Sequence, residues 1–305
     1  MYDIIIIGAG PAGLTAAIYA LRENKKVKII EKETIGGKIA SSARVDNYPG
    51  FKSISGSEFA DNLYEQVINL GGTIDIEEVT KINDGAIKEV ITDYGIYKTK
   101  SIIIATGTHY NTLHLEREED FIGNGISFCT VCDGAFYRNK DVCVIGGANS
   151  AMINAIYLSS ICNKVYLIVR SSKLRGEKSL IDEVCSKENV VILYNSEVVE
   201  YLGDSELEGV LVRRNDSDVK VNASGVFMAI GQAPETSCFD NVELSDNKYI
   251  CANEDCETSM MGVFVAGDVR NKKIHQLTTA ISDGTVAAIN AINYINKVKI
   301  GEKGT

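Results

Sequence analysis

A glycine-rich turn near the N-terminus constrains the fold of this 305-residue chain more than any other feature. An apolar run over residues 3–7 has the composition of a strand buried on both faces, and the turn GAGPAG follows it at residues 8–13. Residues 14–22 then have the pattern of a helix, and a second apolar strand over residues 27–30 ends at Glu31. This order predicts a βαβ unit that binds a dinucleotide, with the pyrophosphate at the helix N-terminus and the ribose hydroxyls on the acid.

The same pattern recurs in the middle of the chain and predicts a second unit of similar layout. Its parts are a strand over residues 141–145, the turn GGANSA at 146–151, a helix over 152–160 and a strand over 165–169. The composition becomes acidic from about Leu113, where we place a crossing between the units, and the chain returns to the first unit near Asp240. A long helix over residues 276–295 closes that unit, and residues 301–305 are expected to be frayed.

Composition and charge exclude several classes of protein. Hydrophobic residues make up 45% of the chain and charged residues 24%, as in ordinary soluble proteins. The formal net charge of -10 argues against nucleic acid and anionic membranes as partners. No segment approaches the roughly 20 apolar residues that span a bilayer, and the N-terminal run has no basic region of a signal peptide. We therefore expect a cytoplasmic protein whose eight cysteines are mostly reduced.

The stretch Cys129-Thr130-Val131-Cys132-Asp133 lies between the two glycine turns and carries the chemistry. Two thiols separated by two residues can close a small disulfide, and an acid follows at once. A zinc ribbon needs a second pair with the same spacing, which the sequence lacks, so we predict no metal site. A dithiol between two nucleotide-binding units favours electron transfer from a bound cofactor to a disulfide.

Taken together, these motifs resemble the low-molecular-weight thioredoxin reductases along essentially the whole chain. The resemblance rests on the first glycine turn, the segment CTVCDG at residues 129–134, the strand end ATG at 105–107, and GDV at 267–269 with Gln276 behind it. It implies a fold of two Rossmann-like α/β domains of the FAD/NAD(P)-binding, three-layer ββα type. Residues 1–112 and 240–305 would form the FAD-binding domain, and residues 113–239 an inserted pyridine-nucleotide-like domain that carries the dithiol.

The resemblance also implies the cofactor, the substrate and the residues that serve them. The protein would be a homodimer that binds FAD and reduces thioredoxin. The residues that match the family's FAD site are Gly8, Gly10, Ala12, Gly13, Glu31, Gly37, Lys38, Asn47, Thr106, Gly107, Gly267, Asp268 and Gln276. Two positions depart from the usual pattern, because Lys38 stands where the family often has glutamine and His275 where it often has arginine.

The roles of the dithiol residues also follow from the resemblance. Cys132 would meet the flavin, Cys129 would attack the disulfide of thioredoxin, and Asp133 would exchange a proton with the leaving thiol. Near the first turn of a helix, Asp133 would also serve as a cap.

The second glycine turn departs from the NADPH-dependent members of the family. Ala148 replaces the glycine that lets the backbone approach the pyrophosphate, and Val169 and Ser171 replace a histidine and an arginine of the run that binds the 2′-phosphate. One lost charge-assisted hydrogen bond, about 1.5–3 kcal/mol, weakens NADPH binding by roughly 10- to 150-fold. The pattern resembles the ferredoxin-dependent flavin thioredoxin reductases.

Several alternatives stay open at this point. Arg170 and Arg175 are retained, so NADPH with a weakened site remains the alternative donor to ferredoxin. Lys173, Arg175 and Lys178 would suit an acidic ferredoxin or equally form a solvated loop. A different disulfide protein is an alternative substrate, and a non-enzymatic flavin-binding protein has no need of the dithiol and its acid.

Overall fold

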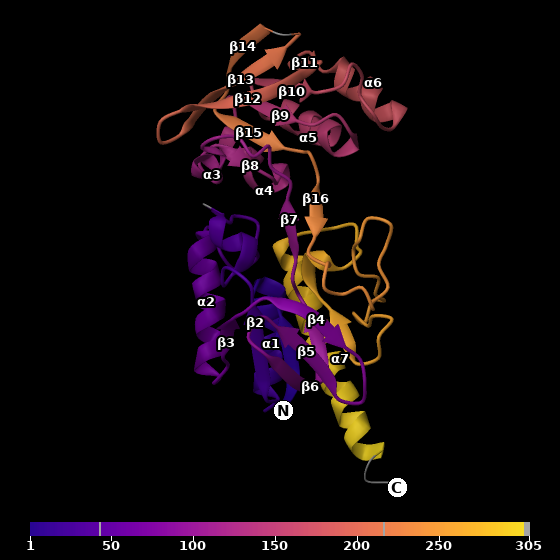
Figure 1. Cartoon of the computed structure of the whole chain (residues 1–305). Helices are drawn as coiled ribbons and strands as arrows, with labels where there is room; N and C mark the ends of the chain where they lie inside the picture. Colours follow the sequence, from indigo (N-terminus) through magenta and orange to yellow (C-terminus); the bar gives the residue numbers. More distant parts are fainter. Residues whose placement is uncertain (43, 216, 302–305) are drawn as a thin grey trace. The chain divides into compact units, whose positions relative to one another are not determined.

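The chain folds into two compact α/β units, shown in a computed structural model that describes residues 1–42, 44–215 and 217–301 (Figure 1). The first unit combines Met1–His109 with Ala233–Thr305, and the second is Tyr110–Gln232. The predicted fold class, with one nucleotide-binding-type unit inserted into the other, is therefore confirmed. The chain passes from one unit to the other at 109/110 and 232/233, whereas the predicted boundaries are 112/113 and 239/240.

A short strand pair explains where the boundaries fall. Strand β7 (Thr108–Tyr110) leaves the first unit and pairs with β16 (Gln232–Pro234), which returns to it. Because the two passages of the chain are hydrogen-bonded to each other, both boundaries lie at this pair. The sequence gives no apolar alternation there, and the acidic stretch after Leu113 lies within the second unit, as it does with the predicted boundary.

A seven-stranded sheet forms the centre of the first unit. Its strands are β1 (Tyr2–Ile7), β2 (Val27–Glu31), β3 (Ile74–Ile76), β4 (Val79–Asn83), β5 (Lys88–Thr92), β6 (Ile96–Ile104) and β17 (Val263–Val265). The order is β3-β2-β1-β6-β5-β4, with β17 also paired to β6. Strands β1, β2, β3, β6 and β17 are parallel, whereas β4 and β5 form an antiparallel flank. The carboxyl ends of the parallel strands thus reach one edge, where ligands of such sheets bind.

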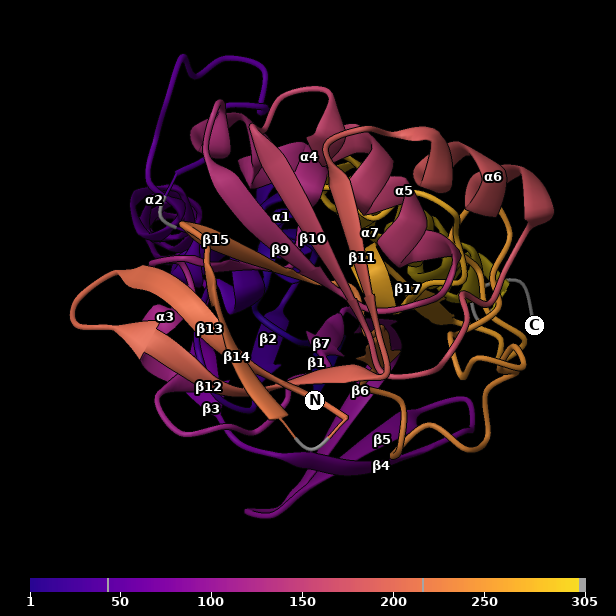
Figure 2. The same cartoon turned by 90° about the horizontal axis from the view of Figure 1, so that it is seen from above.

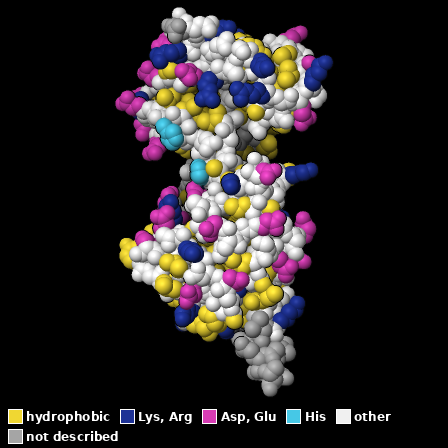
Figure 3. Space-filling model, turned by 45° about the vertical axis from the view of Figure 1, so that its right-hand side comes forward, with side chains coloured by type: hydrophobic (Ala, Val, Ile, Leu, Met, Phe, Trp, Pro, Cys, Tyr) yellow, Lys and Arg dark blue, Asp and Glu magenta, His cyan; other side chains and the backbone are white. Residues whose placement is uncertain are grey.

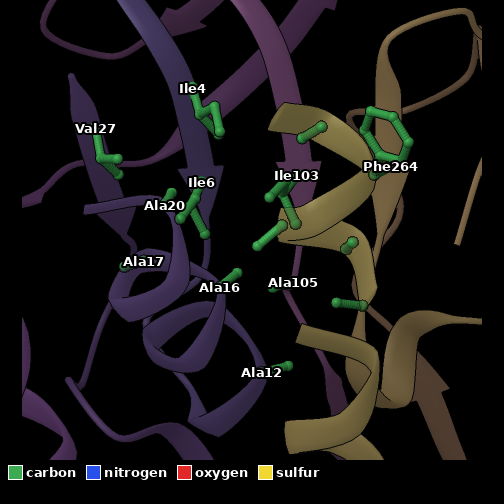
Figure 4. Close-up of a cluster of buried hydrophobic side chains, with 14 of the residues drawn as sticks. Ile4, Ile6, Ala12, Ala16, Ala17, Ala20, Val27, Ile103, Ala105 and Phe264 are labelled. Atoms are coloured by element: carbon green, nitrogen blue, oxygen red, sulfur yellow. The ribbon is translucent and has the colours of Figure 1, made fainter. Parts of the chain in front are cut away.

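Both faces of this sheet are buried, as the isoleucine-rich strands predict. Ile4 and Ile6 pack into one apolar cluster and Ile5 and Ile7 into another, because successive side chains of a strand point to opposite faces. Helices α1 (Pro11–Arg22) and α7 (Leu277–Gly301) cover the first face (Figure 4). Helix α2 (Gly56–Asn69) packs beside α1. The closing helix extends beyond the predicted residue 295, and residues 302–305 of the expected tail lie outside the described residues.

The second unit has three layers (Figure 2). A five-stranded parallel sheet, ordered β11-β10-β9-β15-β8, lies between helices on one face and a three-stranded antiparallel sheet on the other. The parallel strands are β8 (Ile126–Ser127), β9 (Asp141–Ile145), β10 (Lys164–Val169), β11 (Val190–Tyr194) and β15 (Gly225–Met228). Helices α5 (Asn149–Ser159) and α6 (Lys178–Ser186) form the helical layer, and α4 (Thr130–Asp133) lies beside α5. The second sheet comprises β12 (Ser196–Gly203), β13 (Leu207–Arg214) and β14 (Ser217–Asn222), and α3 (Glu118–Phe121) packs on its side.

The described helices and one face of the surface bear on membrane and nucleic-acid binding. Among the described residues, no helix combines the length and the apolar character needed to cross a bilayer. On the face of the molecule in Figure 3, the described acidic and basic side chains are interspersed over both units. This face therefore lacks the continuous basic surface that nucleic-acid binding requires.

The packing of α7 on α1 generates a stability prediction. A Cβ added at Gly284 would lie 2.2 Å from the backbone oxygen of Ala12, so Gly284→Ala must separate the two helices. We expect the free energy of unfolding to fall by about 1–3 kcal/mol, although the same change in an open helix stabilises a protein by about 1 kcal/mol. Urea denaturation followed by circular dichroism measures the effect.

The matched control is Gly95→Ala. A Cβ at Gly95 would meet no atom within 4 Å, so the free energy of unfolding should change by less than about 0.5 kcal/mol. A stabilised Gly284→Ala variant would contradict the close approach of the helices.

Candidate redox site and cofactor cradle

The N-terminus of α1 is an open anion-binding end in the first unit. Gly10 is the N-cap residue, no side chain caps the helix, and Pro11 occupies the first turn. A Cβ at Gly10 would meet no atom within 4 Å, so this glycine faces open space. Backbone N–H groups at such an end attract phosphate oxygens.

Gly8 and Gly13 are needed for a different reason, which is contact with neighbouring backbone. Gly8 has a φ of +105°, and a Cβ there would lie 2.3 Å from the oxygen of Ala105 at the end of β6. A Cβ at Gly13 would lie 1.9 Å from the oxygen of Gly8. The two glycines thus set the distance between the helix and the strands, and Gly10 leaves space for a ligand.

Glu31 lies at the carboxyl end of β2, beside the glycine turn. Its Oε2 accepts a hydrogen bond from the backbone N–H of Ala9 at 2.7 Å, and its Oε1 accepts one from Glu33 at 2.9 Å. The carboxylate is therefore fixed next to the turn, in the position that the predicted contact with ribose hydroxyls requires.

Two further segments converge on the same helix end. Gly36 donates its N–H to the oxygen of Ala9 at 2.9 Å, which holds the 3₁₀ turn η1 (Gly37–Ser41) against the glycine loop. The 3₁₀ turn η3 (Gly267–Val269) arrives from the other end of the chain, and a Cβ at Gly267 would lie 2.9 Å from the Cβ of Ala12. The fold thus gathers Gly37, Ala12 and Gly267 around one helix N-terminus.

Lys38 and Asp268 face each other within this cradle. The Nζ of Lys38 lies 2.6 Å from the hydroxyl of Thr108 and 3.4 Å from Oδ2 of Asp268. Burial lowers the pKa of Lys38, and the negative charge of Asp268 offsets part of that shift. The other carboxylate oxygen of Asp268, Oδ1, is buried and has no hydrogen-bond partner among the described residues. A buried acceptor without a protein donor can accept a hydrogen bond from a ligand or from water.

The remaining predicted cofactor residues lie on loops and have varied surroundings. Thr106 donates its hydroxyl to the oxygen of Glu235 at 2.8 Å, and Gly107 has a φ of +69° at the end of β6. Gln276 directly precedes α7. Asn47 is exposed in the loop closed by the bridge between Val45 and Ile54. The assignment of these four residues to the cofactor, like that of the other cofactor residues, stays a prediction.

In the second unit, Cys129 and Cys132 form a disulfide with Cα atoms 5.3 Å apart. Cys129 is the N-cap residue of α4, and its Sγ accepts the backbone N–H of Cys132 at 3.2 Å. The disulfide therefore begins a helical turn, as the sequence suggests. This N–H group is directed at the sulfur, where it can donate to a thiolate once the disulfide is reduced.

Asp133 is held beside the disulfide by Ser127, a residue that the sequence analysis did not identify. The hydroxyl of Ser127 donates to Oδ2 of Asp133 at 2.6 Å and accepts the N–H of Cys129 at 3.1 Å. Burial raises the pKa of Asp133, and the bond from Ser127 offsets part of the shift. A carboxyl group with a raised pKa is suited to give and take a proton near neutral pH. Ser127 lies only two residues before Cys129, and this closeness in sequence is the feature that could have identified it as a partner of Asp133.

Comparisons with known proteins agree with this geometry. The family described as pyridine nucleotide-disulphide oxidoreductase matches residues 2–284. A thioredoxin reductase of Listeria monocytogenes is 38% identical over 304 residues, which cover 98% of this chain and 95% of the relative. The chain belongs to the low-molecular-weight thioredoxin reductase family.

Two other relatives support the membership. A protein of Clostridium pasteurianum described as a 34.2 kDa protein in the rubredoxin operon is 42% identical over 300 residues, covering 96% of this chain and 97% of the relative. The crystal structure of thioredoxin reductase from Streptococcus pyogenes has a TM-score of 0.94 and 37% identity, and the match covers 97% of this chain and 99% of that one. The likeness extends over both units of the fold.

The second glycine turn (residues 146–151) differs from the first at the N-cap position of the helix that follows it. Ala148 is the N-cap residue of α5 and is exposed, so its methyl group stands where Gly10 leaves open space. The loop between β10 and α6 (residues 170–177) folds back on this turn. Arg175 donates its backbone N–H to the oxygen of Gly147 at 2.8 Å, and Glu177 donates its backbone N–H to Oδ1 of Asn149 at 2.9 Å. A phosphate approaching α5 would meet a methyl group at this end.

Metal chemistry finds no support in the described part of the chain. No group of three or more histidine, cysteine, aspartate or glutamate side chains there is placed to hold a metal ion. The six remaining cysteines are free thiols, and Cys143 and Cys256 are deeply buried. Burial raises the pKa of Cys256 to about 12, so this thiol is unreactive at neutral pH.

The hydrogen bond to the sulfur of Cys129 predicts which thiol reacts first. After reduction, limiting iodoacetamide at pH 7 should label Cys129 about tenfold faster than Cys132, because the N–H of Cys132 stabilises the Cys129 thiolate. Peptide mass spectrometry gives the order, with the exposed Cys185 as an internal reference. Preferential labelling of Cys132 would contradict the assignment.

Proposed function

We propose that this chain is a flavoprotein disulfide reductase that uses FAD and the Cys129–Cys132 pair to reduce thioredoxin. The disulfide at the start of α4, with Asp133 fixed beside it, carries this proposal. Family membership supports it, because relatives with matching length bear the name thioredoxin reductase. The same membership favours a homodimer and a cytoplasmic location.

The cradle in the first unit fits FAD. Open space at Gly10 suits the pyrophosphate, Glu31 suits the ribose hydroxyls, and the buried Oδ1 of Asp268 can accept a hydrogen bond from a hydroxyl of the cofactor. When bound, FAD supplies an electron pair to the disulfide. Contact with FAD is also proposed for the other predicted residues, which are Gly8, Ala12, Gly13, Gly37, Lys38, Asn47, Thr106, Gly107, Gly267 and Gln276.

The two sulfurs of the pair act in successive steps. The Cys129 thiolate attacks the disulfide of thioredoxin, forms a mixed disulfide and releases one thiolate of the substrate. Cys132 next attacks the sulfur of Cys129, which restores the internal disulfide and frees the second thiolate of thioredoxin. Asp133 gives a proton to a leaving thiolate and removes one from Cys132, so each turnover restores its protonation state. Another disulfide protein in place of thioredoxin would react by the same steps.

For the electron donor we propose reduced ferredoxin, which delivers one electron at a time to the flavin. The exposed methyl of Ala148 and the replacement of an expected arginine by Ser171 both oppose NADPH binding at the same site. Exposed basic side chains on the loop before α6 (Arg170, Lys173 and Arg175) and at its first residue (Lys178) suit an acidic protein partner.

NADPH is the second candidate donor, and the same loop favours it. Arg170 and Arg175 are exposed and retained, so a 2′-phosphate still has two cationic partners. The two donors differ in what they require of the second unit, because only NADPH needs a phosphate-binding turn at the start of α5.

Substitution of Cys132 tests the role of the disulfide. Cys132→Ser should lower thioredoxin reduction by about a hundredfold or more, because no internal disulfide can form to carry the electron pair. FAD content should be unchanged, since the proposed FAD residues lie in the other unit. Turnover with thioredoxin and the visible absorbance of the purified protein measure the two quantities. Cys185→Ser, which changes an exposed thiol outside the pair, should leave both unchanged.

The rate at which each donor reduces the flavin distinguishes ferredoxin from NADPH. In anaerobic mixing of oxidised protein with reduced ferredoxin, NADPH or NADH, we expect flavin absorbance to bleach rapidly with ferredoxin and slowly with micromolar NADPH. Ser171→Arg should strengthen NADPH binding by roughly 10- to 150-fold, because it restores one charge-assisted hydrogen bond. Fast bleaching of the unaltered protein by micromolar NADPH would reject ferredoxin as the required donor and leave the proposed reduction of thioredoxin intact.

A further inference from the structure

Lys38 places a positive charge inside the proposed FAD cradle. It belongs to η1, whose first residue, Gly37, lies against the N-cap glycine of α1, since a Cβ at Gly37 would lie 3.3 Å from the Cα of Gly10. The ammonium group is anchored at 2.6 Å by the hydroxyl of Thr108 and lies 3.4 Å from Asp268. Two segments distant in sequence therefore fix the position of the cation.

The pairing with Asp268 decides the net charge of the cradle. One oxygen of Asp268 faces Lys38, and the other is buried without a partner among the described residues. Together the two side chains are neutral. A neutral residue at position 38 would leave the Asp268 carboxylate uncompensated beside the ligand, where partial burial keeps water from screening its charge.

Reduction changes the charge of the ligand that this cradle is proposed to hold. Oxidised FAD takes up two electrons and one proton to give its anionic reduced form, so the bound cofactor becomes more negative by one charge. The electrons come from the proposed donor and the proton from solvent. A fixed cation nearby stabilises the reduced form more than the oxidised form, and charge near the ring is one of the levers by which a protein tunes a flavin.

We propose that Lys38 raises the midpoint potential of bound FAD and thereby sets how readily the flavin accepts electrons from the donor and passes them to the disulfide. This inference rests on the proposed function, because it requires FAD in the first unit. The alternative is that Lys38 only anchors Thr108 and Asp268. The two roles differ in their dependence on charge.

The experiment measures the flavin potential in the absence of the disulfide. Both Cys129 and Cys132 are changed to serine, and the FAD-loaded protein is reduced slowly with xanthine oxidase and a reference dye. At equal dye reduction, Lys38→Gln should hold about tenfold less reduced flavin than the protein with Lys38, a coupling typical of a single charge. For a two-electron couple this fall is about 30 mV. Lys38→Met should give the same shift and guards against an effect peculiar to glutamine.

The pH profile separates a charge effect from an anchoring effect. Because burial lowers the pKa of Lys38, the cation is present below that lowered pKa and is lost as the pH rises through it. The difference in potential between Lys38 and Lys38→Gln should therefore shrink towards alkaline pH. Asp268 and His275 also face this cation, and burial lowers the pKa of His275, so its ring is already neutral in the alkaline range. Lys38→Arg keeps the charge and should retain most of the potential. Lys52→Gln, at an exposed lysine, should change nothing.

The outcomes distinguish this inference from the proposed function. FAD bound with an unchanged potential in Lys38→Gln and Lys38→Met, or a shift that is constant with pH and shared by Lys38→Arg, would overturn the role of Lys38 and leave the reductase proposal standing. Purified protein that binds no FAD would overturn both.

Discussion

The close backbone contacts around the N-terminus of α1 are the constraint on which the rest of the first unit depends. Gly8 lies against the end of β6, Gly13 lies against Gly8, and Gly284 of α7 lies against Ala12. Each contact leaves no room for a side chain, so segments from both ends of the chain reach the same point. The convergence creates a helix end with open space at Gly10, and the segments that carry Glu31 and Asp268 both contact its glycine turn or its first turn. A cofactor cradle is therefore a consequence of how the sheet and helices pack.

The dithiol depends on much more local structure. Cys129 and Cys132 are three residues apart on one turn, and the same turn supplies the N–H group that points at the Cys129 sulfur. Ser127 and Asp133 flank the pair within the same short stretch. The chemistry of this site is thus contained in seven consecutive residues and requires from the second unit only that it hold that stretch in place. Such a module can exchange electrons with a cofactor bound by another part of the chain.

The two glycine turns share a backbone layout but differ at the N-cap of the helix that follows. Both begin an uncapped helix after a buried parallel strand, and both have the backbone layout that attracts phosphate. At the N-cap position the two turns differ, because Gly10 leaves open space and Ala148 places an exposed methyl group there. The strands and helices of the second unit are stabilised by their own buried clusters, so its fold does not depend on a ligand at this turn.

Sequence alone determined the two βαβ units, the disulfide at a helix start and the family, because these depend on short-range patterns of apolar residues, glycines and cysteines. It did not give the position of the unit boundaries, which the pairing of β7 with β16 decides, nor the partnership of Ser127 with Asp133. Only the tertiary structure placed Lys38 against Asp268, 230 residues further along the chain. That contact arises from the return of the chain to its first sheet, and no local pattern encodes which side chains such a return brings together.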